Sequence, residues 1–178
     1  LSEMSFPDLI SIVNIIKNCP KIEIFDMSNA KPTNPIAVEG YGSPNVHSSK
    51  SFYGCSSLTI VRLPYFKFSQ NMAGFLTPTP VTTVDLSNCS IKNTTNGGLF
   101  LFYNCKSLTN LDLTDFDTYG VTTFSQMFWD CNNLQNIDVS SFDTSKVNTM
   151  SGMFAGCNQL TTIDISNFDL SFFNMIPN

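Results

Sequence analysis

Apolar and polar positions recur along this chain in a fixed frame. Three segments that begin at Cys105, Cys131 and Cys157, each 26 residues after the last, share the frame C-x-x-L-x-x-[LI]-D-[LVI]-[ST]-x-F-D. Apolar and polar residues alternate in its centre, which predicts a strand with one buried face. The positions expected to point inward in the first of these copies are Leu108, Leu111 and Leu113.

The residues after each strand predict a change of direction. The [ST]-x-F-D-T string is expected to place Phe116, Phe142 and Phe168 in the core, while Asp117, Asp143 or the adjacent Thr caps a short helical turn. The connecting strings VTTFSQMFWDC and VNTMSGMFAGC carry apolar residues at i, i+3, i+6 and i+7, which predicts a short amphipathic helix or a 3₁₀ segment.

Decayed copies of the same frame occur upstream, so the chain is expected to hold about six repeats. They begin at Cys19, Cys55 and Pro78, with irregular intervals of 36, 23 and 27 residues before the regular part. A fixed period of this size is the signature of a solenoid. The predicted fold is an α/β leucine-rich-repeat-type solenoid, with parallel strands on one face and short helices or 3₁₀ turns on the other.

The whole chain is expected to form one domain, residues 1–178. Its predicted parts are an N-terminal capping helix (1–18), irregular repeats (19–98) that include a loop at 29–51, regular repeats (99–169) and a C-terminal half repeat (170–178). The loop assignment rests on three Pro, two Gly and several Asn and Ser.

The charge balance narrows the range of partners. The net charge is −5, and residues 99–178 hold eight Asp against only Lys106 and Lys146. An acidic half disfavours nucleic acid, because phosphate binding requires clustered Lys and Arg. No run of about 18 apolar residues exists, so no membrane span is expected. We expect a signal or lipid anchor to have been removed before residue 1.

The string MFWDCNNLQNIDVSSFDTSKVNTMSGMFAGCNQLTTIDISNFD resembles the bacterial surface leucine-rich repeats of the BspA-like type, including the version found in mycoplasma lipoproteins. The resemblance is close over residues 99–169 and loose over 16–98. It implies a secreted or cell-surface protein of a host-associated microbe that takes part in adhesion. Arg62, Pro64 and Pro78 depart from the pattern at the Asp, Ser and Cys positions, respectively.

The sequence offers no catalytic or metal-binding motif. The six Cys are expected to be free, buried thiols, because five occupy one core column and Cys89 replaces a core phenylalanine. The only histidine, His47, lies in the predicted loop, and no G-x-S-x-G motif occurs. We therefore expect no enzyme activity, no cofactor and no metal. A glycosidase or lyase that uses paired carboxylates is the enzyme alternative.

A column of aspartates along the strands is the candidate site. If the strands stack in register, neighbouring carboxylates stand about 5 Å apart and repel one another. Hydrogen bonds from neighbouring Ser, Thr and Asn are one explanation of this column; the other is an acidic strip that binds basic protein segments or calcium. The residues of this candidate ligand-binding face are Asp85, Asp112, Asp138, Asp164, Asn110, Asn136 and Thr162.

These features favour a non-catalytic binding module that mediates adhesion to host or microbial protein ligands through the exposed strand face. A glycan-binding module is the second hypothesis, although Tyr65 is the only aromatic residue expected on that face. The third is a structural spacer within a larger surface protein.

Overall fold

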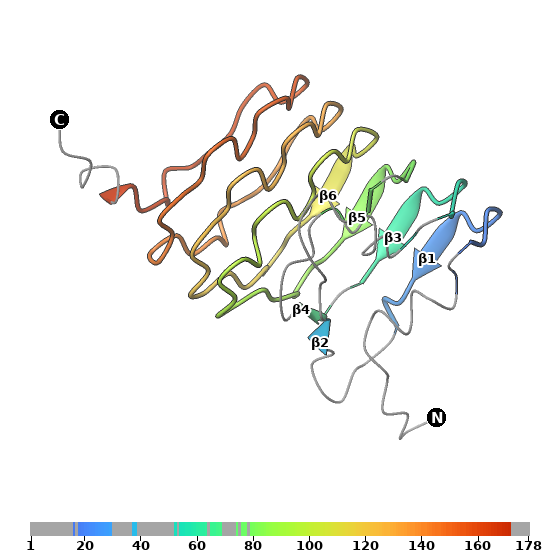
Figure 1. Cartoon of the computed structure of the whole chain (residues 1–178), viewed down its shortest axis with the longest axis horizontal. Coiled ribbons are helices and arrows are strands. Elements are labelled where there is room, and N and C mark those ends of the chain that lie inside the picture. The colour runs from blue at the N-terminus through green and yellow to red at the C-terminus, as the bar shows by residue number, and fades with distance from the viewer. Residues whose placement is uncertain are drawn as a thin grey trace.

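The structure, a computed structural model, describes residues 16, 18–29, 37–38, 52, 54–63, 65–68, 74, 76–77 and 79–171. Successive copies of the repeat form coils that lie side by side in one row (Figure 1). The predicted capping helix, most of the 29–51 loop including His47, and the tail after residue 171 fall outside the described residues, as do Pro64 and Pro78.

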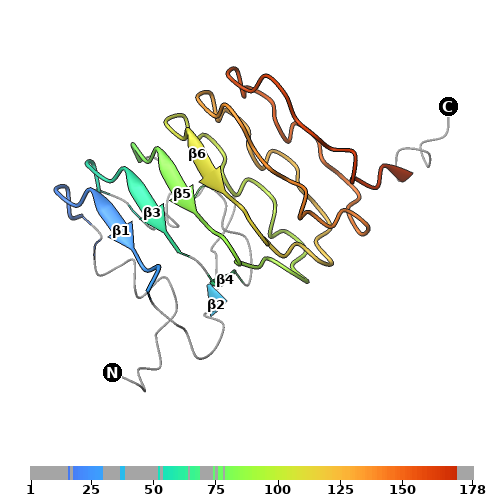
Figure 2. The same ribbon diagram turned by 180° about the vertical axis from the view of Figure 1, so that it is seen from behind.

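Short parallel strands line one side of the row, as the alternating pattern predicts. They form a four-stranded sheet in the order β1-β3-β5-β6, visible from both sides in Figures 1 and 2. Their bounds are Ile24–Asp26 (β1), Ile60–Arg62 (β3), Thr83–Asp85 (β5) and Asn110–Asp112 (β6). Each strand comes from a different copy of the repeat, so this is a repeat fold with a parallel sheet.

A second, smaller pair forms elsewhere in the chain. β2 (Ala37–Val38) pairs in parallel with β4 (Lys67–Phe68). Two residues of the segment predicted as loop 29–51 therefore belong to a strand, which the prediction missed.

The core consists of the repeated apolar positions. Leu108 and Leu113 are buried as predicted, whereas Leu111 is only half-buried. Phe116 and Phe142 are buried, and Phe168, in the last described coil, is half-buried. Another set of phenylalanines stacks between coils: the Phe102 and Phe128 ring centroids are 5.3 Å apart, and the Phe128 and Phe154 centroids are also 5.3 Å apart.

The predicted short helices were wrong. No α-helix forms among the residues that the structure describes, and consecutive turns occupy 125–130 and 151–156 instead. Gln126, Asp130, Gly152 and Gly156 have φ between 54° and 77°, and a left-handed residue at every fourth position ends a right-handed helix before it can form.

Hydrogen bonds between coils replace the helical ones. The N–H groups of 124, 126, 128 and 130 donate to carbonyls of the next coil, and those of 127, 129 and 131 donate three residues back. We call this inter-coil series the turn ladder. It satisfies the backbone donors alternately within and between coils, so the i→i−4 pattern is not needed.

The described part of the chain contains no helix that is both long and apolar enough to cross a membrane.

Candidate functional site

The aspartate column is in register over the four strands. Asp26 lies opposite Arg62, Arg62 opposite Asp85, and Asp85 opposite Asp112. Arg62 Nη1 is 2.7 Å from Asp26 Oδ2, so the arginine that departs from the repeat pattern forms an ion pair with the first aspartate. The uninterrupted acidic run therefore begins at Asp85.

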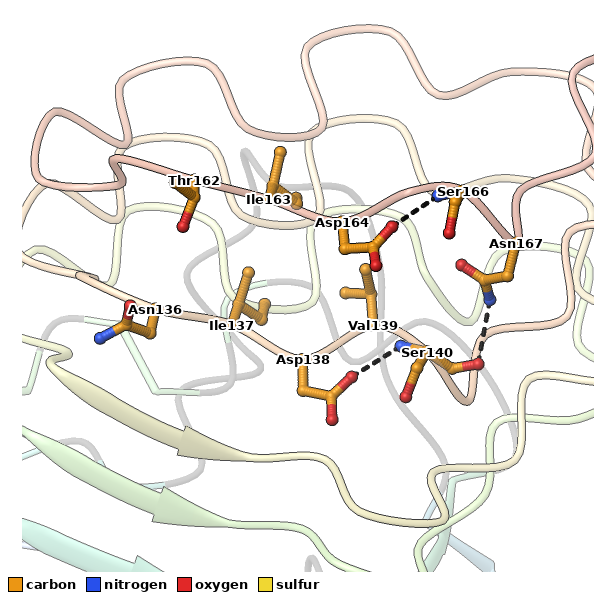
Figure 3. A pocket seen from close by; sticks show the side chains of 10 residues that line it. All are labelled: Asn136, Ile137, Asp138, Val139, Ser140, Thr162, Ile163, Asp164, Ser166 and Asn167. Carbon is orange, nitrogen blue, oxygen red and sulfur yellow. Dashed lines mark hydrogen bonds between the residues drawn. The ribbon is translucent and has the colours of Figure 1, made fainter.

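Asp138 and Asp164 continue the column, but their segments are not strands of the sheet. No backbone hydrogen bond between described residues joins 109–113 to 134–139, or 134–139 to 160–165. Figure 3 shows the two C-terminal segments lying apart, with Asp138 and Asp164 at equivalent places on each. The expectation of one continuous stacked register thus holds only as far as Asp112.

Each aspartate of the column ends its strand or segment with the same hydrogen bond. One carboxylate oxygen accepts the N–H of the residue two positions later, which forms an Asx turn. The pairs, with distances of 2.8 to 2.9 Å, are Asp26–Ser28, Asp85–Ser87, Asp112–Thr114, Asp138–Ser140 and Asp164–Ser166. One oxygen of each carboxylate therefore has a structural role.

A second set of aspartates makes the same turn one corner further along each coil. Asp117, Asp143 and Asp169 accept the N–H of the residues at 119, 145 and 171. The sequence predicted that Asp117 or Asp143 caps a helical turn; the bonds form, but they close Asx turns and not helices. Asp117 also pairs with Lys92 Nζ at 3.2 Å.

At Asp138 and Asp164 these bonds favour the charged carboxylate. The hydroxyl and N–H of Ser140 hold the pKa of Asp138 below its ordinary value, against a smaller opposing effect of the Asp164 charge. The N–H and hydroxyl of Ser166 lower the pKa of Asp164 in the same way. Repulsion along the column is therefore present and is outweighed locally, which supports the hydrogen-bonding explanation of the column.

The predicted face is open to solvent. Asn110, Asp112, Asn136, Asp138, Asp164 and Thr162 are exposed, and Asp85 is half-exposed. The Asx-turn bonds of Asp112, Asp138 and Asp164 all go to Oδ1, and no described residue forms an ion pair with these carboxylates; the hydroxyls of Ser140 and Ser166 also act on Asp138 and Asp164. The Oδ2 atom of each remains available to a ligand.

Two grooves separate the coils where the sheet ends. The first, of about 730 Å³, lies between 109–112 and 135–138. The second, of about 320 Å³, lies between 136–140 and 162–167, where Asn167 Nδ2 donates to the Ser140 carbonyl (Figure 3). Six of the seven predicted face residues line one or both grooves, and Asp85, inside the closed sheet, lines neither.

Sequence reasoning placed Thr109 and Gln135 beside the Asp column, but it missed Ile137 as a lining residue and the groove itself. A signal was present, however. Glu23, Thr59, Thr82 and Thr109 occupy one repeat position. The hydroxyls of Thr59, Thr82 and Thr109 donate to the carbonyls of Glu23, Thr59 and Thr82, respectively, in the preceding coil. That threonine series stops at Gln135, where the groove opens.

The thiols are all free, as predicted, and those of Cys55, Cys89, Cys131 and Cys157 donate hydrogen bonds to carbonyls of earlier coils. Cys55, Cys89, Cys105 and Cys131 are buried as predicted, whereas Cys19 and Cys157 are only half-buried, and burial raises the pKa of Cys89 to about 12. No group of three or more His, Cys, Asp or Glu among the described residues is placed to hold a metal ion.

Two family models match the chain. One, described as a BspA type leucine rich repeat region (6 copies), matches residues 45–126. The other, described as a Mycoplasma protein of unknown function, DUF285, matches residues 97–176. No curated protein and no solved structure matches the chain significantly.

Proposed function

Because the chain is a BspA-like repeat protein, we propose that its strand face binds protein ligands outside the cell and catalyses no reaction. Repeats of the BspA type indicate a surface protein-binding module, and neither matched family is typically catalytic. The finer statement, adhesion to host or microbial proteins, is our proposal. It includes extracellular or cell-surface localisation.

The supporting observation is the free oxygen on each of three exposed carboxylates. Asp112, Asp138 and Asp164 each use one oxygen for an Asx turn and present the other to solvent. A row of fixed negative charges on adjacent coils is complementary to Lys and Arg side chains, which form charge-assisted hydrogen bonds with carboxylates.

The proposal also covers the organisation of the chain. We propose one solenoid of about six repeats over 1–178, with 1–18 as a cap, 19–98 as irregular repeats, 99–169 as regular repeats and 170–178 as a half repeat. Stacked repeats bury a continuous core and leave their outer positions for binding.

The test is solid-phase binding of the purified chain to matrix proteins, mucins and a glycan array, with and without calcium. The key variant carries Asp112→Asn, Asp138→Asn and Asp164→Asn. An amide oxygen still accepts the Asx-turn hydrogen bond, so this variant loses three charges and is expected to keep its turns.

The matched control carries Asp117→Asn, Asp143→Asn and Asp169→Asn. This control also loses three charges and also keeps its Asx turns. Its three substitutions lie at the other corner of each coil. Saturable protein binding that the first variant loses and the control keeps supports the proposal. Binding to glycans alone favours the glycan hypothesis, and no binding to any probe favours the spacer.

A further inference from the structure

The backbone hydrogen bonds that join one strand to the next stop after β6. At the start of each strand, the carbonyls of Glu23, Thr59 and Thr82 each accept two N–H groups from the next coil. The carbonyl of Thr109 is next in this series, and no backbone N–H of a described residue donates to it. β6 is therefore an edge strand of the sheet, although another coil follows it.

The end of the strand shows the same interruption. The N–H groups of Leu63 and Leu86 donate to the carbonyls of Asp85 and Asp112, both at 2.9 Å. The equivalent bond from Leu113 to the carbonyl of Asp138 is absent. An edge strand with unpaired backbone groups is a template for pairing with another extended chain.

The gap is closed at both ends. Asn133 Nδ2 donates to the Lys106 carbonyl at 2.8 Å on one side, and Ser141 Oγ donates to the Leu113 carbonyl at 3.4 Å on the other. Behind it, the equivalent of the turn ladder one coil earlier joins the same two coils, for example by Phe102 N–H to the Met127 carbonyl at 2.8 Å. The groove of about 730 Å³ is thus a bounded window between two coils that are otherwise held together.

The walls of the window determine which occupant fits. They carry two exposed carboxylates, Asp112 and Asp138, and two half-buried aliphatic side chains, Leu111 and Ile137, with no Lys or Arg among the lining residues. Alternate side chains of an extended peptide point to opposite faces, so basic and small residues in alternation match charged and apolar walls.

We propose that this window binds an extended basic peptide segment of the protein ligand, which pairs with the free edge of β6 and places Lys or Arg against Asp112 and Asp138. Main-chain pairing supplies affinity, and the carboxylates select the side chains, as in strand addition generally. The inference rests on the proposed function and names the part of the ligand that the face recognises.

The test uses a fluorescent peptide of seven alternating Lys and Thr residues, measured by anisotropy against the whole chain. A second peptide has the same sequence with every backbone nitrogen methylated, so it keeps the charge and cannot donate to a strand edge. We expect saturable binding of the first peptide and at least tenfold weaker binding of the second.

The protein variants locate the contact. Asp112→Asn and Asp138→Asn are each expected to weaken binding of the unmethylated peptide about tenfold, which corresponds to one lost charge-assisted hydrogen bond. Asp143→Asn removes a charge at the other corner of the coil, outside the window, and keeps its Asx turn, so it is expected to change binding less than about twofold.

Equal binding of the two peptides would overturn edge pairing, and equal loss in the Asp143→Asn and Asp138→Asn variants would overturn the window as the place of contact. If neither peptide binds while a whole protein ligand binds and depends on Asp112, Asp138 and Asp164, the peptide inference fails and the proposed function stands.

Discussion

The thiol of Cys131 donates a hydrogen bond to the carbonyl oxygen of Phe102 in the preceding coil, at 3.2 Å. Three further thiols make the same kind of bond to an earlier coil. They are Cys55 to Ile16 (3.1 Å), Cys89 to Leu63 (2.8 Å) and Cys157 to Phe128 (3.1 Å). A thiol suits this position because it packs as a small apolar group and still gives a carbonyl oxygen a donor.

Stability is expected to fall in alkaline solution because of these thiols. Burial raises the pKa of Cys89 and of Cys105 from 9.0 to about 12. The unfolded thiols lose their protons first, so the contribution is fully present below pH 9 and is lost as the pH rises toward 12. Each thiol adds a slope of up to about 1.4 kcal/mol per pH unit. Urea unfolding between pH 8 and 11 measures this slope.

The control for the alkaline effect is the double variant Cys89→Ala and Cys105→Ala. It lacks both thiols, so its unfolding free energy is expected to depend less on pH over the same range. Equal slopes for the two proteins would contradict the assignment to thiols.

Two substitutions of Asp138 are expected to distinguish the stability that its Asx turn contributes from the stability that its charge contributes. Asp138→Ala removes the acceptor of the Ser140 N–H and is expected to lower the unfolding free energy by about 1 kcal/mol, whereas Asp138→Asn keeps an acceptor and is expected to lose only the smaller part that depends on charge at pH 7. Urea unfolding at pH 7 compares the two. An equally large loss in the asparagine variant would show that the charge, and not the turn, stabilises the coil.

The same residue predicts an acid dependence. Because Ser140 lowers the pKa of Asp138 in the folded state, the stabilisation is present above the ordinary pKa of 3.8 and is lost as the pH falls through the lower, folded value. The asparagine variant is expected to lack this part of the loss when unfolding is repeated at pH 3.

Gly152 is expected to be less tolerant of alanine than Gly74. Both have positive φ, 64° and 63°, so both substitutions carry a backbone cost of about 1–2 kcal/mol. A Cβ on Gly152 would also lie 2.7 Å from Cζ3 of Trp129, whereas the nearest atom to one on Gly74 is 3.7 Å away. Gly152→Ala is therefore expected to cost at least about 1 kcal/mol more.

Tryptophan fluorescence gives the glycine comparison a second readout. Trp129 is the only tryptophan, so Gly152→Ala is expected to shift the native emission spectrum and Gly74→Ala to leave it unchanged. Equal stability losses and unchanged spectra in both variants would show that the ring does not pack on Gly152.

Phe128 is expected to be the most costly member of its stack to truncate. It is fully buried between Phe102 and Phe154, and its ring is nearly parallel to both, at 5° and 6°. Phe128→Ala is expected to lower the unfolding free energy by about 3–5 kcal/mol. Tyr119→Ala, at an exposed position, serves as the surface control and is expected to change it by less than about 0.5 kcal/mol.

The sequence predicted the parts of the fold that follow from a repeated pattern. Equal spacing of Asp85 and Asp112 within their frames gave their register in the sheet, and the C-x-x-L positions gave the core. Periodicity failed on the turn side, because apolar residues at i, i+3 and i+7 suit both a helix and a series of turns. The positive φ of Gln126 and Asp130 produces turns instead of a helix. Neither residue type indicates positive φ in a sequence as strongly as glycine does.

The sequence predicted which residues lie on the candidate face, but it did not predict the grooves between the coils. Asp138 and Asp164 fit the frame as well as Asp112 does, yet their coils do not join the sheet. Whether neighbouring coils pair depends on side chains outside the consensus, such as the residue at the Thr109 position. A consensus averages over those differences, so the groove beside β6 could not be derived from it.

The turn side of the coils is hydrogen-bonded further along the chain than the strand side, and this difference affects the order in which the coils unfold. The turn ladder runs on to residue 155, and the buried hydroxyls of Thr118 and Thr144 accept the N–H groups of Asp143 and Asp169. On the strand side, no backbone hydrogen bond between described residues joins one coil to the next beyond β6. Amide protons of 126, 128 and 130 should exchange with deuterium far more slowly than those of 135–139. Under a pulling force the turn side would carry the load, and the coils would detach singly from the C-terminal end.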